Sequence, residues 1–343
     1  MGRATRAASV SLLALLIAGL AACGGEEKSA PKLAAIPTRT PVPVTATPEV
    51  TPMAANVRVI SLKDNIDAFL TASETASALD RIDLFNRYVI QLAPECFSGE
   101  FYPGVQPLEM LGFNLTSIPM EGWREATDSF PEEDLSASVM ETLEIAMQRL
   151  PVERAIVVCL APMPPFGPPE DVENSGVAVQ VLGGDRLIIT CSAGSICLER
   201  AGWEVVYAYS VAYQMSLAGL TAFETPLLAY IIYAGRAEDF VRQMMPDATF
   251  RWDDALTPEQ EIDVWARMQA YLDTTYQDYP GYRNVDRFIY GQPGSDRYPR
   301  WGGLYIGSRI VHAYRERHPD VSSAELAALS PEDVLAASGY SPG

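Results

Sequence analysis

Apolar residues recur at helical spacing over most of the chain after residue 64. Two neighbouring segments within residues 64–92 each carry an apolar stripe, as expected when one side of a helix packs on a core. The stripe residues are Ile66, Phe69, Leu70, Ile82, Phe85, Val89 and Leu92. The same pattern predicts helices over residues 135–150, 203–219, 225–245, 258–274, 301–318 and 331–338.

Three short segments predict strands instead. Ala155–Leu160 is a β-branched run, AIVVCL, of the kind found in a buried strand. Residues 177–181 and 187–190 flank the turn sequence GGD at 183–185, which is typical of a β-hairpin. Helices followed by a small sheet and then by more helices indicate an α+β fold, with the sheet packed on a mainly helical core.

The first 22 residues differ in character from the rest of the chain. Arg3 and Arg6 precede an uncharged apolar run, Ala7–Leu20, and the sequence LAAC then ends at Cys23. The run is shorter than the roughly 20 apolar residues of a membrane-spanning helix. The order of charge, apolar run and cysteine resembles a bacterial lipoprotein signal. That resemblance implies that residues 1–22 are removed and that Cys23 becomes the acylated first residue. An ordinary signal peptide or a short anchor helix is the alternative.

Residues 23–56 follow as a segment rich in proline and threonine, with no helical or alternating apolar pattern. Proline favours an extended backbone, so this composition predicts a semi-stiff tether. Residues 57–343 are then expected to form the folded domain. We therefore expect the protein in the cell envelope, outside the cytoplasm, held to the membrane through the lipid on Cys23.

The charge of the chain limits its partners. The 343 residues include 25 Lys and Arg against 44 Asp and Glu, a formal net charge of −19. An acidic surface repels phosphate backbones, so we expect no nucleic-acid partner. The sequence does not identify a protein or peptide partner.

Four cysteines besides Cys23 lie in the domain. Outside the cytoplasm an even set of cysteines is expected to form disulfides. Cys191 and Cys197 flank a five-residue loop, SAGSI, and could bridge locally, which leaves Cys96 with Cys159. Buried free thiols are the alternative. The long and unequal spacings of these cysteines do not resemble a structural zinc site.

Five segments after residue 140 carry a family resemblance. They are ETLEIAMQRLPVERAIVVCL at 141–160, GDRLIIT at 184–190, TPLLAYIIYAGRAEDF at 225–240, PRWGGLYIGSRIVHAYRERHP at 299–319 and AELAALSPEDVLAASGY at 324–340. Together they resemble a bacterial zincin-like domain of unknown function, a family described as predicted Zn-dependent proteases. The likeness is strongest over residues 225–340, and it implies a zincin-like fold for the domain.

The resemblance also implies where a metal site would lie. In that family the helix before the TPLL segment carries a His-Glu-x-x-His motif. Its two histidines would bind zinc, and its glutamate would deprotonate the bound water. The matching helix in this chain is residues 207–217. Tyr209 and Tyr213 occupy the positions of the two histidines, and Ser210 occupies that of the glutamate. Ala234 occupies the position of an acidic third ligand, and Glu238 is a retained acid.

The residues at those positions cannot hold zinc. The chain has no histidine before His312, so a shift of the register by one or two residues does not restore the motif. A tyrosine phenol is a poor zinc ligand at neutral pH because its pKa is about 10, and alanine cannot coordinate a metal. We therefore expect no metal, no other cofactor and no catalytic residues. The two tyrosine rings are expected to fill the vacated cavity.

Other candidate chemistry is weaker. His312 and His318, the only histidines, lie six positions apart and would face different sides of a helix. Ser308 lies four residues before His312, but the Gly-x-Ser-x-Gly motif of serine hydrolases is absent. A group of tyrosines could line a sugar or peptide groove or could simply pack between helices. It comprises Tyr271, Tyr276, Tyr279, Tyr282 and Tyr290.

The sequence thus favours a membrane-anchored extracytoplasmic lipoprotein that resembles a zinc protease but lacks its ligands and base. We expect a non-catalytic binding or structural role in the envelope. Two alternatives stay open. One is an active hydrolase or metallopeptidase with a non-standard site, and the other is a lipoprotein that binds a small ligand.

Overall fold

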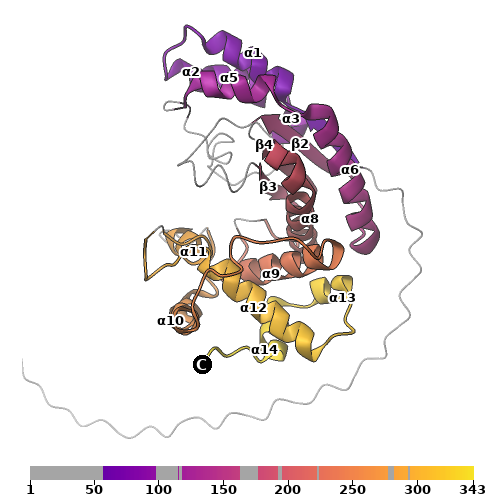
Figure 1. Cartoon of the computed structure of the whole chain (residues 1–343), viewed down its shortest axis with the longest axis vertical. Coiled ribbons are helices and arrows are strands. Elements are labelled where there is room, and N and C mark those ends of the chain that lie inside the picture. Colours follow the sequence, from indigo (N-terminus) through magenta and orange to yellow (C-terminus); the bar gives the residue numbers. More distant parts are fainter. Residues whose placement is uncertain are drawn as a thin grey trace, which may run out of the picture. The chain divides into compact units, whose positions relative to one another are not determined.

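A four-stranded mixed sheet has one group of helices on each of its faces (Figure 1). Its strands are β1 (Val57–Ser61), β2 (Ile156–Pro162), β3 (Val177–Gly183) and β4 (Arg186–Cys191), in the order β1-β2-β4-β3. β1, β2 and β4 run parallel, whereas β3 is antiparallel to β4 and forms an edge of the sheet. The fold is therefore α+β, as the order of elements in the sequence predicts.

The computed structural model describes residues 57–97, 115, 118–162, 177–191, 195–221, 224–276, 282–292 and 294–343. Residues 51–343 form one compact unit. Residues 1–22, the tether and Cys23 lie outside the described residues, so the expectations about them stay predictions. Among the helices that the structure does describe, none has the length and apolar character required to cross a membrane.

Alternate residues of the central strands serve the two faces of the sheet, because successive side chains of a strand point in opposite directions. Cys159 and Ile188 pack with the N-terminal helices, whereas Val158 and Ile189 pack with the helices that follow β4 and with α6. The N-terminal group comprises α1 (Lys63–Ser73), α2 (Asp80–Phe85), the π-helical turn η1 (Asn86–Ile90), α3 (Pro94–Phe97) and α5 (Met120–Asp128).

The larger group of helices builds the main core. The long helix α8 packs against α6, β3 and α9, and α9 in turn packs against α12. This group comprises α6 (Glu132–Arg149), α8 (Ser195–Ala218), α9 (Leu227–Met244), α10 (Pro258–Met268) with the short 3₁₀ turn η2 (Gln269–Tyr271), α11 (Tyr282–Ile289), α12 (Gly302–Arg317), α13 (Ser323–Ala328) and α14 (Pro331–Ser338).

The predicted elements are confirmed where their patterns are long, and several short ones were missed. The β3–β4 hairpin, α9, α12 and α14 lie where the sequence places them. The strand β1 and the helices α5, α11 and α13 were not predicted. Leu92 was assigned to an apolar face but is exposed, because η1 ends at Ile90 and the chain leaves the helical path there.

Both expected disulfides are present. Cys96 of α3 is bonded to Cys159 of β2, with their Cα atoms 5.9 Å apart. Cys191 at the end of β4 is bonded to Cys197 in the first turn of α8, with a Cα–Cα distance of 5.7 Å. The first bond joins an N-terminal helix to the central sheet, and the second fixes the start of α8 relative to β4.

The helices α9 and α12 cross in direct backbone contact (Figure 1). A Cβ atom added at Gly307 would lie 2.0 Å from the carbonyl oxygen of Ile231, and one added at Gly235 would lie 2.2 Å from that of Gly307. Neither position can hold a larger residue unless the two backbones separate. The pair of glycines therefore sets the distance between these helices.

A buried arginine next to this crossing holds the C-terminal segment in place. The guanidinium of Arg236 donates to the carbonyl oxygen of Leu329 at 2.9 Å and to that of Ala327 at 3.3 Å. It also donates to the Gln214 side chain of α8 at 3.3 Å. Burial lowers the pKa of Arg236 to about 10, so the group stays charged at neutral pH. One side chain thus connects α8, α9 and the turn between α13 and α14.

The crossing gives a prediction about stability. Gly307→Ala is expected to lower the free energy of unfolding by about 3 kcal/mol, because the added methyl group forces two backbones apart. Gly202→Ala in α8 is a matched control, since its Cβ would meet the nearest atom at an ordinary 3.5 Å. That change should raise stability by roughly 0.5 kcal/mol through helix propensity. Denaturant unfolding of both variants measures this, and equal stabilities would contradict the assigned contact.

Candidate functional site

A cavity of about 420 Å³ opens between the edge strand β3 and the helices α8 and α9. We call it the cleft. Its walls are completed by residues that follow α9 and by the start of α12. Aromatic side chains dominate the lining: Trp203, Tyr207, Tyr230, Tyr233, Trp252, Tyr290 and Trp301. A concave, largely apolar site with few polar groups is the usual form of a small-molecule or peptide site.

The helix α8 presents one face to the cleft. Tyr207, Ala208, Val211 and Met215 line the cavity, and a spacing of four residues keeps them on one side of a helix. The ring of Tyr207 lies 5.6 Å from that of Trp252, centroid to centroid. Burial raises the pKa of Tyr207 well above its usual value, so the phenol stays protonated and cannot act as an anionic ligand at neutral pH.

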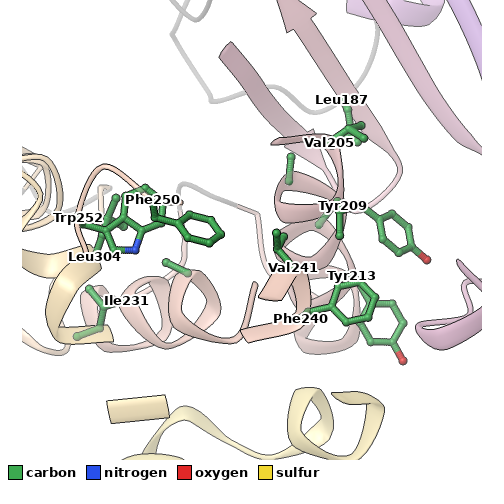
Figure 2. Packing of buried hydrophobic residues seen from close by; sticks show 14 of the residues in the cluster. Leu187, Val205, Tyr209, Tyr213, Ile231, Phe240, Val241, Phe250, Trp252 and Leu304 are labelled. Carbon is green, nitrogen blue, oxygen red and sulfur yellow. The ribbon is translucent and has the colours of Figure 1, made fainter. Parts of the chain in front are cut away.

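The tyrosines singled out in the sequence do not lie in the cleft. Figure 2 shows Tyr209 and Tyr213 pointing away from Trp252 and Leu304. The Tyr209 hydroxyl donates to the carbonyl oxygen of Leu150 at the end of α6. The expectation that these two rings fill the cavity was therefore wrong. Tyr207, and not Tyr209, faces the cleft. Residues two positions apart on a helix point about 200° away from each other, so the two side chains lie on opposite sides of α8.

The other expected site positions are divided between two places. Ala234 of α9 lines the cleft. Ser210 is buried beside Gln214, whose amide donates to the Ser210 carbonyl oxygen at 3.1 Å. Glu238 lies one turn beyond Ala234 on α9 and faces a second cavity of about 350 Å³, which Ser308 and His312 also line.

Glu238 is a structural anchor in the described chain. Its carboxylate accepts hydrogen bonds from Trp252 Nε1 at 2.5 Å, Ser308 Oγ at 2.8 Å and Arg242 Nε at 3.0 Å. These bonds connect α9 to α12 and to the residues after α9. The Ser308 hydroxyl is therefore bonded to Glu238. His312 is exposed and pairs with Glu316 at 3.4 Å. The structure does not assemble a Ser–His pair.

The candidate tyrosine cluster is also divided. Tyr290 lines the cleft, and its hydroxyl lies 2.8 Å from that of Tyr230. Tyr276 donates to Asp286 at 2.7 Å, and Tyr271 packs on Phe288. Tyr279 and the side chain of Tyr282 lie outside the described residues. Of the described members, Tyr290 contributes to the cleft and the others pack between elements.

Glu204 is a cleft residue that the sequence reasoning missed. It projects from α8 into the cavity with its side chain 17% exposed, and Arg251 Nη2 lies 3.6 Å from its Oε1. Burial raises the pKa of Glu204 to about 7, although Arg251 and Arg200 both act to lower it. The signal available was a lone acid within the apolar run AGWEVVYAY.

Trp301 lines the cleft and has a strained backbone conformation. Its φ of 63° lies in the left-handed region, which costs a bulky residue about 1–3 kcal/mol and occurs most often at ligand sites. Trp301 precedes the first turn of α12, and the Arg251 guanidinium lies 5.8 Å from its ring centroid. Trp301, Arg251 and Glu204 thus form one connected wall of the cleft.

The residues around the cleft do not fit a catalytic zinc ion. Such a site takes three protein ligands drawn from His, Cys, Asp and Glu. In the described ranges of the chain, no three residues of these types gather closely enough to hold a metal. Of the described residues that line the cleft, Glu204 alone belongs to these types. This donor set does not support zinc-assisted hydrolysis.

Comparison with known proteins identifies one family. Residues 207–336 match the sequence profile of a family described as "Predicted Zn-dependent protease (DUF2268)". The matched region contains α9, α12 and the part of α8 that lines the cleft from Tyr207 onward, but none of the sheet. No curated protein and no solved structure is significantly similar to the chain. The family resemblance is therefore confirmed for this region.

The environment of Glu204 predicts a dependence of stability on pH. Its native pKa of about 7 lies above the ordinary value of 4.5, so the native state binds the proton more tightly than the unfolded state does. Stability should then fall as pH rises from 5 to 8, by at most about 3 kcal/mol from this group.

Denaturant unfolding at the two pH values measures this effect. Glu204→Gln should remove this part of the pH dependence, because the amide does not titrate. Glu199→Gln is the matched control, since Glu199 is an exposed acid on the same helix. If Glu204→Gln and wild type lose the same stability between pH 5 and pH 8, Glu204 is not the responsible group.

Proposed function

We propose that this protein is a non-catalytic, zincin-like relative of the zinc-dependent proteases that uses the cleft to bind a ligand outside the cytoplasm. The observation that carries the proposal is the chemistry of the cleft walls. Tyr207 and Val211 of α8 lie at the i, i+4 spacing of a metal-binding histidine pair, and Ala234 of α9 faces the same cavity. A phenol, an isopropyl group and a methyl group stand at these positions.

The binding part of the proposal rests on the shape and lining of the cleft. Its volume suits a small ligand or a few residues of peptide. Aromatic rings offer a large and rigid contact area at low entropic cost. Among the described residues β3 pairs with β4 alone, so its outer edge offers backbone donors and acceptors to an extended ligand. Ligand binding accounts for these features better than a purely structural role.

We further propose that Cys23 is acylated and that residues 23–56 hold the domain away from the membrane. The support is the order of charge, apolar run and cysteine within residues 1–23. Two buried disulfides in the domain agree with an oxidising compartment.

The absence of metal ligands in the cleft gives a test of the catalytic state. Purified protein offered zinc at neutral pH should retain far less than one zinc ion per chain, as measured by mass spectrometry of the metal. It should not hydrolyse a mixed peptide library. Stoichiometric zinc with hydrolysis that a chelator abolishes would overturn the proposal and favour the alternative of an active metallopeptidase.

A gain-of-metal variant tests the geometry of the same positions. Tyr207→His, Val211→His and Ala234→Glu together should produce tight binding of one zinc ion, because the three side chains converge on one cavity. Tyr209→His, Tyr213→His and Ala234→Glu form the matched control, which has the same spacing on the opposite side of α8. Circular dichroism checks that both variants fold. Zinc binding by the control alone would refute the assigned face.

The lipid anchor has its own test. Cys23→Ser should move the protein from the membrane fraction to the soluble fraction and abolish labelling by a fatty-acid analogue, because the acylated thiol is lost. A protein that stays in the membrane fraction after this change would show that the apolar run itself is the anchor.

A further inference from the structure

The loop between α11 and α12 carries a tyrosine ring with three arginines around it. The guanidinium carbons of Arg267, Arg287 and Arg297 lie 5.9, 5.7 and 5.5 Å from the centroid of the Tyr298 ring. Arg267 comes from α10, Arg287 from α11 and Arg297 from the loop itself, so three elements place these cations. None of the four side chains lines the cleft. They form a separate charged group on the domain.

Local contacts fix the position of the Tyr298 ring. It packs edge-on against the buried ring of Phe288, with the two centroids 5.3 Å apart. The Tyr298 N–H donates to Ser295 Oγ at 3.1 Å, and the Tyr298 carbonyl oxygen accepts from the Gln292 N–H at 2.8 Å. The arginines therefore lie against a surface whose place in the fold is set by its own packing and hydrogen bonds.

Arg267 supports the group from below the loop. Its guanidinium donates to the Asp263 carboxylate at 2.7 Å and also to the backbone carbonyl oxygen of Arg297. The first contact pairs the charge of Arg267 with an acid, and the second holds the loop backbone at Arg297. Arg267 is thus a positioning residue, with its donors already in use.

Arg287 and Arg297 keep their hydrogen-bonding capacity. In the part of the chain that the structure describes, neither guanidinium makes a hydrogen bond or an ion pair, and each contacts the Tyr298 ring. A cation above a ring is attracted by the π face and does not spend its N–H donors, of which a guanidinium has five in one plane. The two guanidinium carbons are at most about 11 Å apart, the sum of their distances to the ring centroid.

Two such cations suit a ligand with more than one anionic group. Guanidinium donors match phosphate oxygens in pairs. A diphosphate is long enough to contact both arginines when they are far apart, whereas one phosphate or carboxylate requires them to be closer. The net charge of −19 repels a long phosphate polymer from the rest of the surface. A small ligand therefore fits better than a nucleic acid.

We propose that Arg287 and Arg297, held on the Tyr298 ring, form an anion site that binds a diphosphate group of a small molecule or of a lipid headgroup. The two arginines donate to the diphosphate oxygens, and Arg267 keeps the loop in place. The site lies outside the cleft, so this inference goes beyond the proposed function.

The test uses inorganic pyrophosphate and phosphate as probes. Isothermal titration of the full chain in detergent solution, without divalent cations, should show pyrophosphate binding at least about tenfold tighter than phosphate, because the diphosphate alone reaches both arginines. Equal binding of the two anions, or no binding of pyrophosphate, overturns the inference.

Variants assign the contacts. Arg287→Gln and Arg297→Gln should each weaken pyrophosphate binding about tenfold or more, because each removes a charged donor. Arg149→Gln is the matched control, since Arg149 is an exposed arginine at the end of α6, and it should leave binding unchanged. The melting temperature of each variant shows whether it is folded. A folded Arg287→Gln or Arg297→Gln protein that binds pyrophosphate as wild type does overturns the assignment.

Asp296 provides a test that a folding defect cannot imitate. It is exposed and directly precedes Arg297, so its carboxylate repels an anion at the site. Asp296→Asn should strengthen pyrophosphate binding about twofold or more. Asp320→Asn, at an exposed acid after α12, should have no effect. Unchanged or weaker binding in Asp296→Asn would count against the site.

A lipid arm distinguishes the two sources of the diphosphate. Hydrogen exchange of residues 294–300 is measured with the protein on phosphatidylcholine vesicles, with and without farnesyl diphosphate, and with pyrophosphate in solution. Slower exchange with farnesyl diphosphate assigns the site to a lipid headgroup, and slower exchange with pyrophosphate alone assigns it to a soluble ligand. Unchanged exchange with both overturns the inference. These variants leave the cleft residues intact, so this inference and the proposed function can fail separately.

Discussion

The close crossing of α9 and α12 is the constraint on which the described site depends. Gly235 and Gly307 bring the two backbones into contact, so the relation between these helices is set by covalent geometry rather than by adaptable side chains. With the crossing fixed, Glu238 reaches Ser308 across it, and Arg236 reaches the turn after α13. The opposite side of α9 then presents Tyr230, Tyr233 and Ala234 to the cleft.

Arg236, Glu238 and Glu204 are three charged side chains of this domain that differ in the contacts that they make. Glu238 has three donors, and Arg236 has two backbone carbonyls and an amide oxygen. These hydrogen bonds fix the positions of the elements that they connect. Within the described part of the chain, Glu204 pairs with Arg251 at 3.6 Å, and burial raises the pKa of its carboxyl group to about 7.

The residues of α8 and α9 that line the cleft give it aromatic and apolar walls. The helix α8 faces it at the spacing that a histidine pair would need, yet the residues present are Tyr207 and Val211. Those side chains extend the apolar and aromatic lining of the cleft. In the proposed function, the scaffold serves recognition in place of hydrolysis.

The α+β class, the β3–β4 hairpin, the helices α9 and α12 and the family resemblance of residues 207–336 could be predicted from the sequence, because these depend on local pattern or motif order. Cysteine spacing suggested both disulfide pairings but left free thiols as the alternative. It did not determine which side of α8 faces the cleft. That helix is apolar on nearly every side, so periodicity fixes the angle between Tyr207 and Tyr209 but not the direction of either. Only tertiary packing, with α6 on one side and α9 on the other, decided that Tyr209 is a core residue. The strand β1 and the pair Glu204–Arg251 likewise needed the fold, because each depends on a partner distant in sequence whose position no local pattern encodes.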